Sequence, residues 1–417
     1  MSDHRNITER QNLPERGHAL SAAQHLRAGW GVYVHVPFCR SKCAYCDFYS
    51  HPADKTFRMA YGNAVIGQME REAGHWRRRL PSGPATVFFG GGTPTLLPGA
   101  AGAQILETLR RCYGLDERRG SAETPAEITI EANPGTVDER ELASWAEAGC
   151  NRISLGVQAF QPRLLAFLGR RQRLADVTEA VALARKIGID NISLDLIYGI
   201  PGQTLEDWRL SLELALGLAP AHLSLYNLKA EAGTPLAEWM NRGLANPCDE
   251  DLEVEMYEAA RQILKSAGLA QYELSNFARP GRECRHNLNY WRRGDYLGFG
   301  SGAVSAAGLQ RWSWPADSSA FVHAFQKGET FLPIEEEGLS ALVAAQEAII
   351  LGLRTMRGVS LTAVAGEYGL DDTTFEKWHR LSADLSRQGW IDYDGTTISL
   401  APRSYLIANE IMARYLD

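Results

Sequence analysis

Apolar residues recur along this chain with two alternating periods, one typical of strands and one typical of helices. Short apolar stretches with strand patterning lie at 31–36, 86–89, 127–131, 152–156, 191–196 and 222–226. Helical spacing fills segments between them, at 54–79, 138–148, 174–187 and 204–217. Strands that alternate with helices build a parallel sheet, because the crossover between parallel strands is right-handed. We therefore predict an α/β fold, a partial (β/α)6 barrel, in which ligands bind at the carboxyl ends of the strands.

The pattern changes after about residue 330. Helices are predicted at 338–354, 361–368 and 372–388, and two short strands at 390–393 and 396–400 flank the turn Asp394-Gly395. Helices followed by a small hairpin indicate a winged-helix-like domain. Acidic residues are too frequent in it for a basic DNA-reading surface, so we expect no nucleic-acid partner. A cap over the barrel or a docking surface is the favoured role.

These patterns divide the chain into four parts. Residues 1–29 are expected to form a mobile N-terminal tail, and residues 30–240 the core barrel. Residues 241–330 are expected to extend the barrel, and residues 331–417 to form the C-terminal helical domain with its winged-helix-like hairpin.

Composition narrows the class of protein. The chain has 417 residues, of which 45% are hydrophobic and 22% charged, and its net charge is −7. This charge gives no electrostatic reason to propose nucleic acid or an anionic membrane as a partner. The first 29 residues lack the apolar run of a signal peptide, and no stretch approaches the roughly 18 apolar residues of a membrane span. We expect a cytoplasmic protein, or a mitochondrial matrix protein in a eukaryote.

Three of the seven cysteines, Cys39, Cys43 and Cys46, fall in one short loop after the first predicted strand. Thiolates favour iron–sulfur clusters or zinc. A cluster of four irons held by three cysteines would leave one iron open to a small molecule. The alternative is a structural zinc site, for which His51 is a candidate fourth ligand.

The spacing Cys-x3-Cys-x2-Cys resembles that of the radical S-adenosylmethionine (SAM) proteins. The resemblance implies a [4Fe–4S] cluster whose unique iron binds the amino and carboxylate groups of SAM. It also implies that Gly90-Gly91-Gly92-Thr93, which follows the second strand, binds the amino-acid portion of SAM. Residues without Cβ let backbone approach a ligand, although a tight turn alone explains the glycines equally well.

Polar residues stand near the ends of the other predicted strands. Glu131 and Asp195 could bind SAM hydroxyls or its ammonium group, or be a helix N-cap or a solvated acid. Gln158 offers an amide with both donor and acceptor, and Arg170 a planar fork for the SAM carboxylate. Either of these two could also be a surface residue.

Further motifs resemble the branch that contains oxygen-independent coproporphyrinogen III oxidase. They are Tyr-Val-His-Val-Pro-Phe-Cys at 33–39, Gly-Gly-Gly-Thr-Pro-Thr at 90–95, Ile-Glu-Ala-Asn-Pro at 130–134, Ser-Leu-Gly-Val-Gln at 154–158 and Asp-Leu-Ile-Tyr-Gly-Ile-Pro-Gly-Gln at 195–203. The similarity spans roughly 31–305. It implies that Cys39, Cys43 and Cys46 hold the cluster. It further implies a SAM site formed by Tyr33, Tyr45, Gly91, Gly92, Thr93, Glu131, Gln158, Arg170, Asp195 and Lys229.

Two features resemble the HemW-type heme chaperones of this branch more than the oxidase. The oxidase has a fourth cysteine where this chain has Phe48, and His286-Asn-Leu-Asn-Tyr-Trp291 is similar to an element associated with heme binding in the chaperones. The resemblance implies heme as a cofactor, with His286 as a candidate iron ligand and Cys284 as a second one. An ordinary loop packed on the barrel is the alternative explanation of the element.

We therefore expect a heme chaperone that passes heme to an acceptor hemoprotein, including possible contact with membrane hemoproteins without membrane insertion. The alternative is an enzyme, a coproporphyrinogen dehydrogenase that decarboxylates coproporphyrinogen to protoporphyrinogen.

Overall fold

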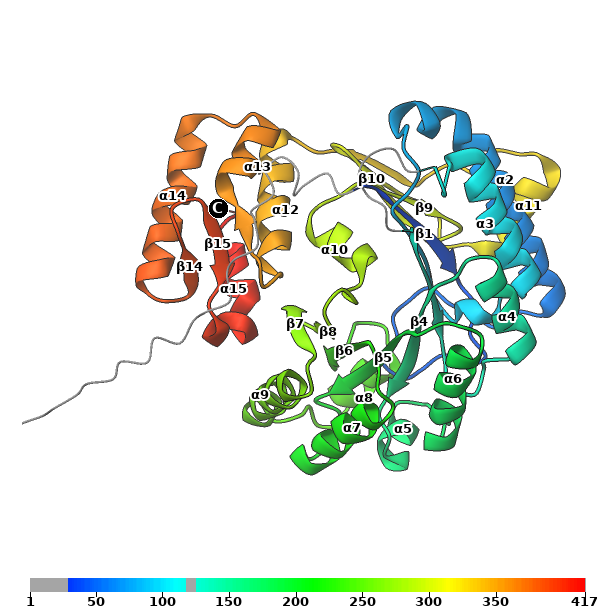
Figure 1. Ribbon diagram of the computed structural model, residues 1–417, viewed down its shortest axis with the longest axis horizontal. Coiled ribbons are helices and arrows are strands. Elements are labelled where there is room, and N and C mark those ends of the chain that lie inside the picture. The colour runs from blue at the N-terminus through cyan, green and yellow to red at the C-terminus, as the bar shows by residue number, and fades with distance from the viewer. Residues whose placement is uncertain (1–28, 118–124, 417) are drawn as a thin grey trace, which may run out of the picture.

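A curved sheet forms the centre of the molecule (Figure 1). The structure is a computed structural model that describes residues 29–117 and 125–416. Six parallel strands pair in chain order, and all six were predicted from the sequence. They are β1 (Gly31–Val36), β2 (Thr86–Gly91), β3 (Glu127–Ala132), β4 (Arg152–Gln158), β5 (Asn191–Tyr198) and β6 (His222–Asn227). The α/β fold with a partial barrel is thereby confirmed.

Later strands lengthen the sheet at both edges to twelve strands within the described residues. Beside β1 lie β9 (Tyr296–Phe299), β10 (Val304–Ala307), β11 (Gln310–Ser313) and β12 (Glu335–Gly338). Beside β6 lie β8 (Asn276–Ala278) and β7 (Ala270–Glu273). Segment 241–330, predicted to extend the barrel, thus contributes strands to both edges.

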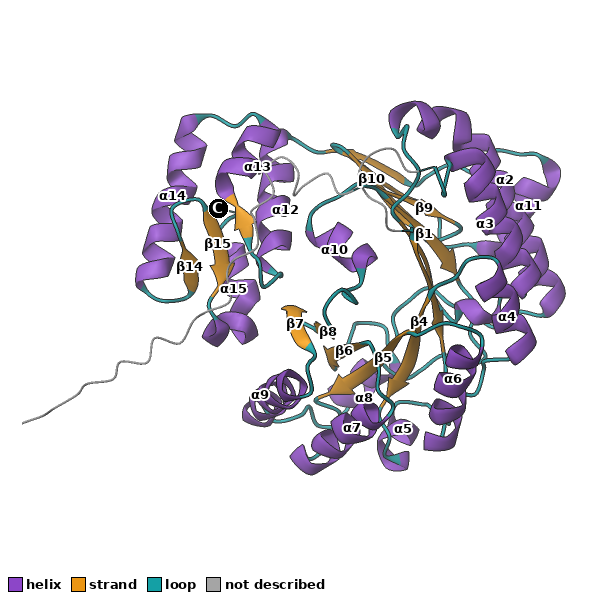
Figure 2. Cartoon of the chain, in the orientation of Figure 1, coloured by secondary structure: helices purple, strands orange, loops and turns teal. Residues whose placement is uncertain are grey.

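Helices cover the convex side of the sheet (Figure 2). They are α2 (Lys55–Arg79), α3 (Gly99–Tyr113), α4 (Glu139–Glu147), α5 (Pro162–Phe167), α6 (Leu174–Lys186), α7 (Leu205–Gly217), α8 (Pro235–Asn241), α9 (Glu250–Ser266) and α11 (Ser318–Lys327). Helix α2 begins where the Asp54 carboxylate accepts a hydrogen bond from Phe57 N at 2.7 Å, a cap worth about 1 kcal/mol. Helices α3 and α4 pack closely because Gly102 has no side chain: a Cβ there would lie 2.3 Å from the Trp145 ring.

One short helix, α10 (Arg285–Trp291), lies on the concave side of the arc instead (Figure 1). It contains the predicted heme-binding element and packs against β2 and against the C-terminal domain.

The C-terminal domain has its own core around Trp378 and Tyr415, both 2% exposed or less. Its elements are α12 (Ala341–Leu353), β13 (Val359–Ser360), α13 (Leu361–Tyr368), α14 (Asp372–Arg387), β14 (Ile391–Tyr393), β15 (Thr397–Leu400) and α15 (Ala408–Ala413). These four helices and a sheet of order β13-β15-β14 agree with the predicted winged-helix-like arrangement.

Two further expectations concern the N-terminal tail and membrane-spanning segments. The predicted N-terminal tail, except Gly29, lies outside the described residues. Within the described ranges, no helix combines the length and the apolar character needed to cross a membrane.

Candidate functional site

A cavity of about 500 Å3 opens at the carboxyl ends of the parallel strands, and we call it the barrel-mouth cavity. Most of the predicted site residues line it. They are Cys39, Cys43, Tyr45, Cys46, Gly91, Gly92, Glu131, Gln158, Arg170, Asp195 and Lys229. Tyr33, Thr93 and His286 are not among the lining residues. Residues from seven chain segments therefore meet at the edge of the sheet where the topology predicted a site.

The three cysteines lie in the loop between β1 and α2 and are half-buried. The loop is held by backbone hydrogen bonds, from Ala44 N to Leu168 O (3.1 Å) and from Leu236 N to Ala44 O (2.9 Å). Three soft thiols that share one cavity wall, with open volume beside them, fit an iron–sulfur cluster that also carries a small-molecule ligand.

His51, the fourth ligand of the zinc alternative, lies apart from this cavity. Its Nδ1 atom is 2.9 Å from Pro52 O, and its Nε2 atom is 2.7 Å from the Ser318 hydroxyl. Both ring nitrogens therefore already have partners. Among the described residues, no group of three His, Cys, Asp or Glu side chains could hold a single metal ion.

The glycines after β2 are required by close packing as well as by the cavity. Gly91 has φ of +111°, and a Cβ on it would lie 2.5 Å from the His35 ring. A Cβ on Gly92 would lie 2.6 Å from the Phe38 carbonyl oxygen. Gly91 thus leaves room for the His35 side chain of β1, and Gly92 for the backbone that leads into the cysteine loop.

Arg170 occupies the centre of a polar network on one wall. Its guanidinium donates to Tyr45 Oη and to Gly156 O, both at 3.2 Å, and also to the Asn133 amide oxygen. The Asn133 amide in turn donates to Thr93 Oγ1 at 2.7 Å, and that hydroxyl lies 3.6 Å from Cys39 Sγ. Thr93 thus supports the cysteine loop from behind the wall.

Asn133 was not among the predicted site residues, although it lines the cavity and joins Thr93 to Arg170. It follows β3 directly, in the same motif as Glu131, and this position was the available signal. Tyr226 at the end of β6 lines the cavity as well and was also missed.

Two acids that line the same cavity, Glu131 and Asp195, have pKa values shifted by burial. Burial, and next the neighbouring Asp195, raise the pKa of Glu131 to about 8. Burial also raises the pKa of Asp195, whose carboxylate accepts hydrogen bonds from Ser154 Oγ at 3.0 and 3.1 Å. Such carboxylates favour a ligand that brings hydroxyl or ammonium donors, because the donors offset the cost of burying the charge.

Gln158 ends β4 with a φ of +66°, an uncommon conformation for a residue with a side chain. The register of β4 against β5 shifts between Gly156 and Gln158, and the irregularity places Gln158 at the cavity. Backbone of this kind is concentrated at functional sites.

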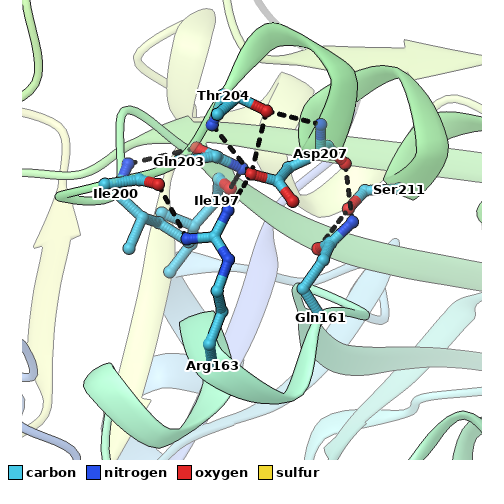
Figure 3. Close-up of polar contacts among 9 residues, drawn as sticks. Gln161, Arg163, Ile197, Ile200, Gln203, Thr204, Asp207 and Ser211 are labelled. Carbon is cyan, nitrogen blue, oxygen red and sulfur yellow. Dashed lines mark hydrogen bonds and ion pairs between the residues drawn. The ribbon is translucent and has the colours of Figure 1, made fainter.

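The loop after β5 is fixed from outside the cavity (Figure 3). Gln203 accepts a hydrogen bond from Ile200 N at 3.1 Å, and Arg163 donates to Gly202 O at 2.7 Å. Thr204 and Asp207 form a capping box that starts α7. These contacts position Ile197, which lines the cavity, so much of the motif 195–203 is structural.

His286 lies at the opposite, amino end of the barrel. It is 1% exposed, with Nδ1 2.8 Å from Thr86 Oγ1 and Nε2 2.9 Å from Tyr290 Oη. Burial, and next Arg152, lower the pKa of His286 to about 3. Cys284 is fully buried, with its Sγ 3.7 Å from a Glu127 carboxylate oxygen.

Tyr33, a predicted SAM-site residue, does not line the barrel-mouth cavity. Its hydroxyl lies 3.0 Å from His35 Nδ1 inside the barrel.

Buried hydrogen bonds connect the two ends of the barrel. Ser193 Oγ lies 3.3 Å from an Asp195 carboxylate oxygen and 2.8 Å from His222 Nδ1. His222 Nε2 lies 2.8 Å from Tyr272 Oη, which accepts a bond from Cys284 N at 3.2 Å. This chain joins a wall of the barrel-mouth cavity to the start of α10.

Comparison with known proteins agrees with this geometry. The radical SAM superfamily matches residues 33–215. The chain is also similar in fold to coproporphyrinogen III oxidase (HemN) of Escherichia coli, with a TM-score of 0.76 over 94% of this chain and 92% of that one, at 22% identity. The fold and site thus define a radical SAM protein, a class whose cofactors are a [4Fe–4S] cluster and SAM.

Sequence relatives specify the branch. The heme chaperone HemW of Synechocystis is 40% identical to this chain over 79% of each protein. That of Bacillus subtilis is 34% identical over 92% of this chain and 98% of the relative. The chain belongs to the HemW heme chaperone family, which confirms the resemblance found in the sequence.

Proposed function

We propose that this protein is a heme chaperone that binds heme and transfers it to an acceptor hemoprotein. Its relatives along nearly the whole chain are heme chaperones by name, which supports the role. The barrel-mouth cavity is the observation that carries the accompanying cofactor proposal, because it gathers Cys39, Cys43 and Cys46 beside an open volume. A cytoplasmic location belongs to this proposal.

In this proposal the three cysteines hold a [4Fe–4S] cluster, and SAM occupies the remaining volume of the cavity. When bound, the cluster and SAM supply one-electron chemistry. The protein's own contribution is positioning: Arg170 offers a guanidinium for a carboxylate, and Glu131 and Asp195 offer acceptors for hydroxyl or ammonium groups. The chain Asp195–Ser193–His222–Tyr272 gives the cavity a contact route to α10.

Decarboxylation of coproporphyrinogen remains the second candidate. The observation that favours it is the full set of lining groups suited to SAM, which a purely binding protein would not need. The role of His286 as an iron ligand stays a prediction, and it would require Nε2 to leave Tyr290 Oη.

The two candidates are separated with one anaerobically reconstituted preparation. One half is titrated with heme and then mixed with an apo-hemoprotein, and both steps are followed by absorbance. The other half is assayed for carbon dioxide release from coproporphyrinogen III with SAM and a reductant. Stoichiometric heme binding and transfer without carbon dioxide supports the chaperone, whereas carbon dioxide release without a stable heme complex overturns it.

A further inference from the structure

A second cavity, of about 460 Å3, lies between α10, β7 and the C-terminal domain, and we call it the interdomain cavity. None of its lining residues lines the barrel-mouth cavity. Its walls are largely apolar and include Tyr272, Leu288, Trp291, Met356, Val359 and Val364. A volume of this size with mainly apolar walls is typical of small-molecule sites.

The walls are fixed by contacts between the two domains. Met356 N donates to Tyr272 O at 3.0 Å, and Leu274 N donates to Arg354 O at 3.1 Å. The Arg354 guanidinium lies 4.4 Å from the centroid of the Trp291 ring and 3.6 Å from the buried Glu273 carboxylate. A cavity with such walls is formed before a ligand arrives, which lowers the entropic cost of binding.

Two cations, Arg292 and Arg357, line the interdomain cavity together. Neither forms an ion pair with an acid within the described residues, although Glu283 also contributes to the lining. Burial, and next the proximity of Arg357, lower the pKa of Arg292. Two like charges at one cavity repel each other, and anionic groups of a ligand would remove this cost.

Trp291, which lines the interdomain cavity, also has a hydrogen-bond donor that is unpaired within the described residues. The indole N–H of Trp291 is buried and has no hydrogen-bond partner among the residues that the structure describes. Buried donors without partners are rare in folded proteins, and a bound ligand is one way to satisfy them.

We propose that the interdomain cavity binds a flat, apolar ligand with two carboxylates, and that Arg292 and Arg357 bind those carboxylates. Given the function proposed above, on which this inference rests, the ligand is heme. Its apolar ring would contact the walls beside Trp291 and Met356, and its two propionates would meet the two guanidinium groups. Tyr272 belongs both to this cavity wall and to the hydrogen-bond chain that starts at Asp195.

The test is an equilibrium titration of the full chain with heme and with heme dimethyl ester, whose propionates carry no charge. The variant is Arg292→Ala/Arg357→Ala. Arg380→Ala/Arg387→Ala on α14 is the control, because it removes the same charge from side chains that are 79% and 78% exposed. Charged hydrogen bonds predict a loss of heme affinity of about 10-fold or more per arginine in the variant, and no change in the control.

The ester tests the role of the propionate charges on the unmodified protein, so this part of the test does not depend on the stability of the variant. We expect the unmodified protein to bind the ester about as weakly as the variant binds heme. Equal affinity of the unmodified protein for heme and ester, or equal heme affinity of variant and unmodified protein, overturns the assignment of the cavity. A protein that binds neither compound overturns the proposed function itself.

Discussion

The two ends of the barrel carry similar side chains in opposite situations. At the carboxyl end, Glu131, Asp195 and Arg170 surround an open cavity of about 500 Å3. At the amino end, Glu127 and Arg152 are buried in the barrel, together with His286 of α10. Carboxyl groups and an arginine therefore line open space at one end of the barrel and lie in closed packing at the other.

The two ends differ in packing: the protein's own side chains fill the amino end, whereas the carboxyl end contains an open cavity. Arg152, at the start of β4, is 2% exposed. Burial acts to lower its pKa, yet the nearby Cys284 thiol and Glu127 carboxylate raise it above the ordinary value. Changes at the amino end should therefore cost stability, and changes at the carboxyl end should cost cofactor binding.

The largest expected effect is the loss of the cluster in Cys43→Ala. Two cysteines cannot replace three ligands, so iron and sulfide bound after anaerobic reconstitution should fall to background. The side chain is only half-buried, and the free energy of unfolding should change by less than about 1 kcal/mol. Cys112→Ala, outside the cavity, should retain the cluster. A Cys43→Ala protein with four irons would contradict the assignment.

Arg152→Met should destabilise the protein by about 3–5 kcal/mol, because it leaves the Glu127 carboxylate without its neighbouring cation inside the barrel. Urea unfolding of the cluster-free protein measures this loss. Arg209→Met, on the exposed side of α7, should cost less than about 0.5 kcal/mol. Equal stability of the two variants would show that the amino end is not held by buried charge.

His286→Ala should cost about 2–3 kcal/mol of stability, since it removes two buried hydrogen bonds and leaves Thr86 and Tyr290 without them. Its heme affinity, measured on folded protein, should fall less than that of Arg292→Ala/Arg357→Ala. A complete loss of heme binding by a folded His286→Ala protein would instead assign iron ligation to this residue.

Glu131 should make stability depend on pH. Its folded pKa of about 8 lies above its ordinary value of 4.5, so the native state favours the protonated form. This contribution is complete below pH 4.5 and is lost as the pH rises toward 8, by up to about 1.4 kcal/mol per unit. Glu131→Gln should flatten the dependence in urea unfolding between pH 5 and 8. An unchanged profile would show that Glu131 does not titrate in this window.

Lys229→Ala should have the smallest effect. Lys229 is exposed at the rim of the barrel-mouth cavity, and exposed charges contribute little. We expect SAM affinity to fall less than about 3-fold in calorimetry, against at least about 10-fold for Arg170→Ala. A similar loss in both variants would make Lys229 a principal SAM contact.

The sequence predicted the central strands and the carboxyl-end site well. Strand β1 begins and ends where expected, and β4 extends only from the predicted 152–156 to 152–158. Apolar, β-branched stretches carry this information locally. The position of the site could be predicted because parallel strands bring their carboxyl ends to one edge of the sheet. Glu131 and Asp195 could therefore be placed together from the sequence alone.

Other parts depend on contacts that no local pattern specifies. Strands β7 to β12 have three or four residues each, too few for a clear alternation. They join the barrel through two pairings across long sequence separations, β9 with β1 and β8 with β6. The position of His286 depends on which end of the barrel the chain reaches after β8. The interdomain cavity needs Tyr272, Trp291 and Met356 from three segments, and only the packed structure brings these together.

The most direct test of the separation between the two ends is an equilibrium heme titration of the cluster-free Cys43→Ala protein beside the reconstituted unmodified protein. If heme binds in the interdomain cavity and the cluster in the barrel mouth, the two dissociation constants should agree within about 3-fold. Loss of heme binding together with the cluster would contradict the account and place heme in the barrel-mouth cavity.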